Sequence, residues 1–168
     1  MDLKAIEKSL LHLDEYPLEQ WNPKLCEGVR FDIDKDANWF YNGSKIERLN
    51  MVKLFSKLIK IEDESYFIVT PSEKIPVFVA NEIFSIIDFK RKEGDYFFKT
   101  NTNEWVKLTK NTPLIVEMRG NQPYPRMELN QNISGLLTRS LFYNLVSEAQ
   151  YKREKAFIES DKTLFYLN

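Results

Sequence analysis

The first candidate for chemistry is a short polar run that separates two strongly apolar segments of the chain. It reads Thr70-Pro71-Ser72-Glu73-Lys74 and brings hydroxyl, carboxylate and ammonium groups together. Because Pro71 restricts the local backbone, these side chains are partly pre-organised before any ligand binds. The run predicts either a binding site for a polar ligand or an ordinary tight connection with an exposed ion pair.

Two arginines and two tyrosines are the next candidates. Arg48 and Arg139 each lie on a segment with helical apolar spacing, and a planar guanidinium group matches carboxylate or phosphate. The rings of Tyr124 and Tyr143 can stack on a nucleobase. The alternatives are surface arginines that extend toward water and tyrosines that belong to the core.

Alternating acidic residues early in the chain resemble the opening of a calcium loop. These residues are Asp32, Asp34, Asp36 and Asn38. An EF-hand that starts at Asp32 needs Gly at its sixth place and Glu at its twelfth, but those places hold Ala37 and Gly43. We therefore interpret the pattern as a solvated strand end followed by a turn.

Nucleophilic, metal and cofactor chemistry find no support in the sequence. His12 and Cys26 are the sole histidine and cysteine, which cannot supply a zinc site of the usual kind. The chain has no G-x-S-x-G segment, and its five glycines form neither a phosphate-binding loop nor a dinucleotide fingerprint. We predict no catalytic residue, no metal and no cofactor, so an uncharacterised hydrolase or transferase is the third hypothesis for function.

An alternation of apolar and polar residues predicts the first strands that must position these groups. Residues 29–33 alternate apolar and polar side chains, and the aromatic segment 38–41 follows. Asn42-Gly43 tolerates positive φ at both positions, which is typical of a hairpin turn. The pattern predicts a β-hairpin here and further strands later, including a terminal strand over 164–167.

Three helices are predicted from apolar periodicity. Ser44 and Glu47 have the spacing of a capping box, so a helix should begin at Ser44 and carry its apolar stripe to Ile59. A second helix is predicted over 132–148, and a short N-terminal helix over 3–13.

The two longer predicted helices match each other at an offset of 87 positions. The paired residues are Ile46 with Ile133, Leu49 with Leu136, and Phe55 with Phe142. We interpret the match as a duplication and predict two related domains, 1–85 and 86–168. The predicted fold class is α+β, with two mostly antiparallel small domains that each contain a packed helix. A cleft between two such halves is the natural place for a ligand.

Composition narrows the class of partner. Twenty-four Lys and Arg against 25 Asp and Glu leave a net charge of −1, so no broad field attracts nucleic acid or an anionic membrane. One cysteine and the lack of an apolar signal core favour a reducing compartment, and we expect a cytoplasmic protein. The sequence does not determine whether the chain forms a homo-oligomer.

The ordered set of motifs resembles a bacterial family, the domain of unknown function numbered 1285 (DUF1285). The resemblance spans about Trp21 to Phe165 and rests on Trp21-x-Pro23, Ile33-Asp34, Trp39-Phe40-Tyr41-x-Gly43-Ser44-x-Ile46-x-Arg48, Leu54-Phe55, Thr70-Pro71-x-Glu73-Lys74, Phe98-x-Thr100-Asn101, Pro123-Tyr124 and Leu137-Thr138-Arg139-x-x-x-Tyr143. Two segments depart from the family pattern. Residues 152–163 are charged and lack Trp and Gly, and an acidic Glu62-Asp63-Glu64 run replaces a family loop.

The resemblance implies a fold and a site. It implies a duplicated two-domain α+β protein whose C-terminal half is a partial barrel plus helix, superficially similar to pleckstrin-homology folds. It also implies an inter-domain groove for a nucleotide-like anionic ligand, and a role in signal transduction. Our first hypothesis for function is therefore a non-enzymatic sensor of such a ligand. The ligand-binding residues it implies are Arg48, Thr70, Glu73, Lys74, Asn101, Tyr124, Arg139 and Tyr143. The alternative function is a protein-interaction module that binds a partner protein and no small ligand.

Overall fold

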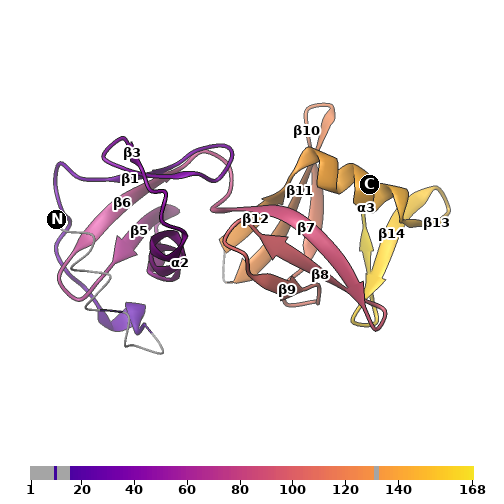
Figure 1. The fold of residues 1–168 in the computed structure, drawn as a ribbon, viewed down its shortest axis with the longest axis horizontal. Coiled ribbons are helices and arrows are strands. Elements are labelled where there is room, and N and C mark those ends of the chain that lie inside the picture. The colour runs from indigo at the N-terminus through magenta and orange to yellow at the C-terminus, as the bar shows by residue number, and fades with distance from the viewer. Residues whose placement is uncertain (1–9, 11–15, 131–132) are drawn as a thin grey trace. The chain divides into compact units, whose positions relative to one another are not determined.

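A computed structural model describes Leu10 and residues 16–130 and 133–168 (Figure 1). The predicted N-terminal helix over 3–13 and His12 lie outside the described residues, Leu10 excepted. The chain divides into two compact units, Met1–Asn81 (unit 1) and Glu82–Asn168 (unit 2), and each is described by itself. Both are built mostly of strands with a packed helix, so the predicted α+β class is confirmed. In the described part, no helix is long and apolar enough to cross a membrane.

Unit 1 is a six-stranded sheet with one face covered by a helix. Its spatial strand order is β3 (Ser44–Lys45), β2 (Trp39–Tyr41), β1 (Phe31–Ile33), β6 (Lys74–Val79), β5 (Ser65–Val69) and β4 (Ile59–Glu62). β1 and β6 are parallel, and the other neighbours are antiparallel. A short 3-10 helix, η1 (Leu18–Gln20), precedes the sheet, and α2 (Leu49–Lys57) connects β3 to β4. Rings of Phe31 and Phe55 pack 5.1 Å apart, and Trp39 lies 6.2 Å from Phe31.

The predicted start of the first long helix is wrong. Ser44 belongs to strand β3, and α2 begins only at Leu49, with Arg48 as an N-cap whose side chain makes no capping hydrogen bond. The physical reason is that the Ile46 amide donates to the carbonyl of Trp39. That bond extends the β2–β3 hairpin and takes the place of a capping box.

Unit 2 contains a second six-stranded sheet and a smaller one. The large sheet has the order β10 (Leu114–Arg119), β11 (Gln122–Asn130), β12 (Ile133–Leu137), β7 (Phe84–Lys92), β8 (Asp95–Thr100) and β9 (Trp105–Lys107). Only β12 and β7 are parallel among these described strands. Helix α3 (Arg139–Ser147) leads into a three-stranded sheet of β13 (Gln150–Lys152), β14 (Lys155–Ser160) and β15 (Thr163–Tyr166). The buried core includes Ile86, Phe98 and Leu145.

The segment 132–148, which is predicted as one helix, contains a strand followed by a helix. Ile133–Leu137 is strand β12, and α3 starts at Arg139, with the Thr138 side chain accepting from the Leu141 amide. Gly120-Asn121 is a two-residue hairpin turn between β10 and β11. Gly120 has a φ of 62°, which the first central residue of such a turn requires.

The offset of 87 is wrong as a structural register. It pairs Leu49, in α2, with Leu136, in a strand. Helix α3 instead begins 90 positions after α2, at Arg139 against Leu49. At that spacing the buried Met51, Val52 and Phe55 correspond to the buried Leu141, Phe142 and Leu145. Each helix is followed by a hairpin, so the two related domains share a helix–hairpin order.

Five hairpin turns in the described chain have both central residues at positive φ. They are Asn42-Gly43, Asp63-Glu64, Glu93-Gly94, Arg153-Glu154 and Asp161-Lys162. This type I′ geometry matches the twist of the flanking strands and fixes their register. The Glu93-Gly94 and Asp161-Lys162 turns present charged side chains at the tips of their hairpins.

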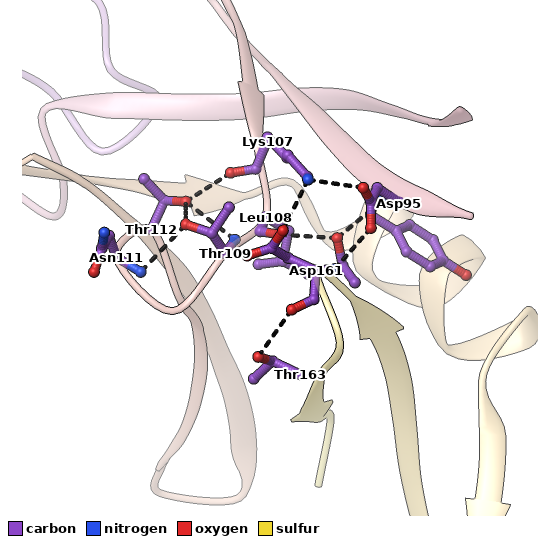
Figure 2. Close-up of polar contacts among 10 residues, drawn as sticks. Asp95, Lys107, Leu108, Thr109, Asn111, Thr112, Asp161 and Thr163 are labelled. Carbon is purple, nitrogen blue, oxygen red and sulfur yellow. Dashed lines mark hydrogen bonds and ion pairs between the residues drawn. The ribbon is translucent and has the colours of Figure 1, made fainter. Parts of the chain in front are cut away.

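A charged cluster joins the large sheet of unit 2 to the small one (Figure 2). Lys107 Nζ lies 2.8 Å from Asp95 Oδ2 and 2.9 Å from Asp161 Oδ1. The Asp161 amide also donates to Asp95 Oδ1 at 2.7 Å. Beside them, the buried Ser160 hydroxyl donates to the Leu108 carbonyl and accepts from the Tyr96 amide.

Lys107→Met is expected to destabilise unit 2 at neutral pH and to flatten its stability profile in acid. The hydrogen bond from Lys107 lowers the pKa of Asp95 below its ordinary 3.8. This stabilisation is therefore present above the ordinary pKa and is lost as pH falls through the lowered one. The effect should be modest, because the groups are partly exposed and salt screens them.

Thermal unfolding across acid pH measures this contribution. Lys110→Met, which removes an exposed lysine nearby, is the control. Parallel pH profiles for Lys107→Met and the wild type would contradict the assignment of Asp95.

Candidate functional site

The polar run at 70–74 forms the tight connection between β5 and β6 in unit 1. The Thr70 hydroxyl accepts from the Glu73 amide at 3.0 Å, and the Thr70 amide donates to the Glu73 carbonyl at 2.9 Å. Thr70 is only 3% exposed. Its hydroxyl therefore holds the turn together, while Glu73 and Lys74 are each half-buried.

Lys74 is engaged in an ion-pair network along the same sheet. Its ammonium group pairs with Glu62 and lies 4.4 Å from the centre of the Phe67 ring. Glu62 also lies 3.6 Å from Lys60, and the hydrogen bond from Lys74 is the main cause of its lowered pKa. The charge of Lys74 is thus largely balanced within unit 1. Arg48 is exposed at the start of α2.

The alternating acidic residues of unit 1 form a turn. Asp34 Oδ1 accepts from the backbone amides of Asp36 and Asn38 at 2.9 and 2.8 Å. Burial acts to raise the pKa of Asp34, but these hydrogen bonds leave it lowered. In the described part of the chain, no group of three or more His, Cys, Asp or Glu residues is placed to hold a metal ion. The hydrogen bonds of Asp34 confirm the interpretation of this segment as a strand end and turn.

In unit 2, Tyr124 is the best buried of the predicted tyrosines. Its hydroxyl donates to Glu82 Oε1 at 3.1 Å, and Ser134 Oγ donates to Glu82 Oε2 at 2.5 Å. Tyr124 is 9% exposed, and burial, together with the charge of Glu82, raises its pKa to about 12. The phenol therefore stays protonated and acts as a fixed donor. Asn101 contacts another part of the sheet, where its Oδ1 accepts from the Ser85 amide at 3.3 Å.

Two guanidinium groups lie at the end of β10 and at the start of α3. The Arg119 guanidinium covers the Tyr124 ring, 3.3 Å from its centre. Arg139 Nη2 donates to Gln122 Oε1 at 2.7 Å. Arg119 and Gln122 face each other across the β10–β11 ladder, so both arginines lie around the same strand end. Within the described residues, neither guanidinium forms an ion pair.

Tyr143 completes this group on the helix. It follows Arg139 by one helical turn, so the two side chains share a face of α3. The Tyr143 side chain is 58% exposed, and its ring lies 6.4 Å from that of Phe142. We define the arginine site as Arg119, Gln122, Tyr124, Arg139 and Tyr143.

Sequence reasoning found three members of the arginine site and missed two. Tyr124, Arg139 and Tyr143 were predicted, whereas Arg119 and Gln122 were not. Their signal is the Gly120-Asn121 pair, because a two-residue hairpin turn places the residues on either side of it opposite each other. The other predicted residues lie elsewhere. Asn101 is in the turn that follows β8, and unit 1 contains Arg48, Thr70, Glu73 and Lys74.

Comparisons with known proteins cover nearly the whole chain. Residues 16–82 match the model described as "Domain of unknown function (DUF1285), N-terminal domain". Residues 78–167 match "Protein of unknown function (DUF1285), C-terminal domain". No curated protein matches the chain.

Two solved structures of the same family resemble this fold. A protein from Silicibacter pomeroyi DSS-3 is 24% identical, with a TM-score of 0.83 over 98% of this chain and 93% of that one. A protein from Shewanella baltica OS155 is 25% identical, with a TM-score of 0.59 over 74% of this chain and 96% of that one. The likeness extends through both units in the first case.

Proposed function

Because this chain belongs to the DUF1285 family, whose function is unknown, we propose a function from its own geometry: it binds a small anionic, nucleotide-like ligand without catalysis. The observation that carries this proposal is the pair of guanidinium groups, Arg119 and Arg139, at one strand end of unit 2. As part of the proposal, ligand occupancy is a cytoplasmic signal, in keeping with the resemblance noted above. The likeness of this unit to pleckstrin-homology folds remains a prediction.

The charges of the arginine site favour phosphate. A guanidinium has five N–H donors, and the hydrogen bond from Arg139 to Gln122 uses one of them. The remaining donors suit bidentate contact with phosphate oxygens. Arg139 is also the first residue of α3, where the helix dipole favours negative charge. The N-terminus of α3 and the two arginines therefore both attract negative charge.

The two tyrosines have different roles in the proposed site. Arg119 already covers one face of the Tyr124 ring, and burial fixes the hydroxyl on Glu82. Tyr124 therefore positions Arg119. Tyr143 is exposed on the same helix face as Arg139, so its ring is the one available to stack on a base. These groups recognise a ligand, and none of them acts as a nucleophile, which supports binding without reaction.

Arg139→Gln is expected to weaken nucleotide binding by about 10–100-fold. A hydrogen bond to a charged group contributes about 1.5–3 kcal/mol, and each 1.4 kcal/mol changes affinity about tenfold. Calorimetric titration of the full chain with adenine and guanine nucleotides measures the effect. In thermal unfolding, ligand at about 100 times its Kd should add about 2.7 kcal/mol of stability.

Arg153→Gln is the matched control, since it removes an exposed arginine in the β13–β14 turn. Arg48→Gln shows whether unit 1 contributes to nucleotide binding, because the predicted ligand-binding residues include several from unit 1. The proposal fails if no nucleotide binds the wild type, or if Arg139→Gln binds as tightly as Arg153→Gln.

A second candidate function, binding of a partner protein, rests on a concave apolar surface of unit 1. The concavity has a volume of about 470 Å³ and is lined by Phe40 and Phe78 together with Ile33 and Val79. Phe78 is 56% exposed, with the Arg30 guanidinium 5.3 Å from its ring centre. Large exposed apolar rings of this kind are typical of protein-interaction surfaces.

Phe78→Ser is expected to abolish capture of such a partner, while Arg139→Gln leaves capture intact. Leu25→Ser is the matched control, because Leu25 is an equally exposed apolar residue of unit 1, at 54%. Affinity purification of the three variants distinguishes the candidates. Equal capture by the Phe78 and Leu25 variants would rule out the concave surface.

A further inference from the structure

A second concave site lies at the other end of α3. It is a cavity of about 330 Å³ between the β7–β8 hairpin and the β14–β15 hairpin. The turns Glu93-Gly94 and Asp161-Lys162 contribute to its wall, and Glu148, the C-cap residue of α3, closes it on the helix side. Its size is at the lower end of the range for small-molecule sites.

Carboxylates outnumber cations in the wall of this cavity. The lining acids are Glu93, Asp95, Glu148, Glu159 and Asp161, and the lining bases are Arg91 and Lys162. Lys107 approaches from β9 and pairs with two of the acids. Within the described part of the chain, Glu93, Glu148 and Glu159 form no ion pair. With Lys107 counted, five acids face three bases, so the site has an excess charge of two negative units.

A tyrosine hydroxyl without a hydrogen-bond partner is an independent feature of the same cavity. Tyr96 lines the wall and is only 3% exposed, yet no described residue hydrogen-bonds to its hydroxyl. The Arg91 guanidinium lies 5.1 Å from the centre of the Tyr96 ring, and Arg91 and Glu148 both line the cavity. Trp39 Nε1, in unit 1, is the only described side-chain polar atom shut off from solvent without a partner. The Tyr96 hydroxyl is therefore reached through the cavity, and it offers an unused donor and acceptor there.

The dipole of α3 also favours a cation at this cavity. A helix C-terminus has partial negative charge on its last carbonyl groups and favours cations nearby. Glu148 caps that end, at the cavity, whereas Arg139 begins the opposite end. Nine residues at 1.5 Å each separate the two ends by roughly 13 Å. One helix thus presents opposite signs to two distinct sites.

We propose that this cavity binds a small organic cation with at least two ammonium groups, of the alkyl diamine or polyamine class. Two positive charges match the two excess carboxylates. An ammonium group supplies three donors, which suit the carboxylates and the Tyr96 hydroxyl. Phe157 is an apolar residue of the same wall and is available to the alkyl stem. The proposal is independent of the arginine site, which uses none of these residues.

Calorimetric titration of the full chain with putrescine, a short alkyl diamine, tests the proposal at low salt. The wild type should bind putrescine and not the neutral diol of the same length. Glu148→Gln and Tyr96→Phe should each weaken binding about threefold to tenfold, since each removes one hydrogen-bonding group. Glu27→Gln, at an exposed acid of unit 1, should leave binding unchanged, and so should Arg139→Gln.

Three results would overturn the proposal. The first is equal binding of the diol, which would show that charge is irrelevant. The second is equal loss in Glu148→Gln and Glu27→Gln, which would show general screening by counterions. The third is binding of inorganic phosphate that is lost in Arg91→Gln, which would assign the cavity to an anion.

Discussion

Gly135→Val is expected to destabilise unit 2 by more than about 3 kcal/mol, a large part of the stability of a domain. A Cβ at Gly135 would lie 2.7 Å from Ile86 Cδ1, 3.1 Å from Ile86 Cγ1 and 3.2 Å from Phe84 Cβ. Gly135 faces Phe84 across the parallel β12–β7 pair, and Ile86 is fully buried, so neither neighbour can move into solvent. Urea unfolding followed by circular dichroism measures the loss.

A graded series identifies the clash as the cause. Gly135→Ala should cost about 1–3 kcal/mol, and Ile86→Val alone about 0.5–1.5 kcal/mol. Ile86→Val removes the Cδ1 atom that lies closest to the new Cβ, so the double variant should lose less than the sum of the two changes. Simple additivity would show that the destabilisation has another origin.

Phe55→Ala is expected to destabilise unit 1 by about 3–5 kcal/mol. The Phe55 side chain is fully buried on α2, where its ring packs against Phe31 at 5.1 Å. The substitution removes the ring contact and leaves a cavity between the helix and the sheet. The fluorescence of the buried Trp39, which lies 6.2 Å from Phe31, reports unfolding of this core in urea.

Phe78→Ala is the control for the loss of an aromatic ring alone. Phe78 belongs to the same sheet but is more than half exposed, so its removal should cost little stability. Equal effects of the two substitutions would contradict the assignment of Phe55 to the core.

Strands with clear alternation and a turn pair were predictable from the sequence. The hairpin of Phe31–Ile33 and Trp39–Tyr41 is the best example, because its local pattern and its tertiary burial agree. Segment 133–137 was not predictable in the same way. Ile133, Leu136 and Leu137 have helical spacing, and only Gly135, which a helix disfavours, indicated that the chain is a strand.

The residues of the candidate sites also differ in whether a local sequence pattern could group them. Arg139 and Tyr143 lie one helical turn apart, so local spacing was enough to group them. Arg119 joins them only through the register of β10 and β11, which depends on the type of turn between them. The cavity at Tyr96 depends on contacts with the end of α3 and the β14–β15 hairpin, more than 50 positions away. No local pattern in the sequence reports such an assembly.

The two parallel strand pairs determine which steps in the folding of each unit are slow. Most neighbouring strands are joined by short turns, and hairpins of that kind form within about 1–10 μs. Val77 is 46 positions from its partner Phe31, however, and Gly135 is 51 positions from Phe84. Closing such long loops lowers the conformational entropy of the chain before the contacts between the two strands can stabilise the pair. Each unit must therefore assemble its hairpins quickly and complete its sheet late, when the parallel pair closes.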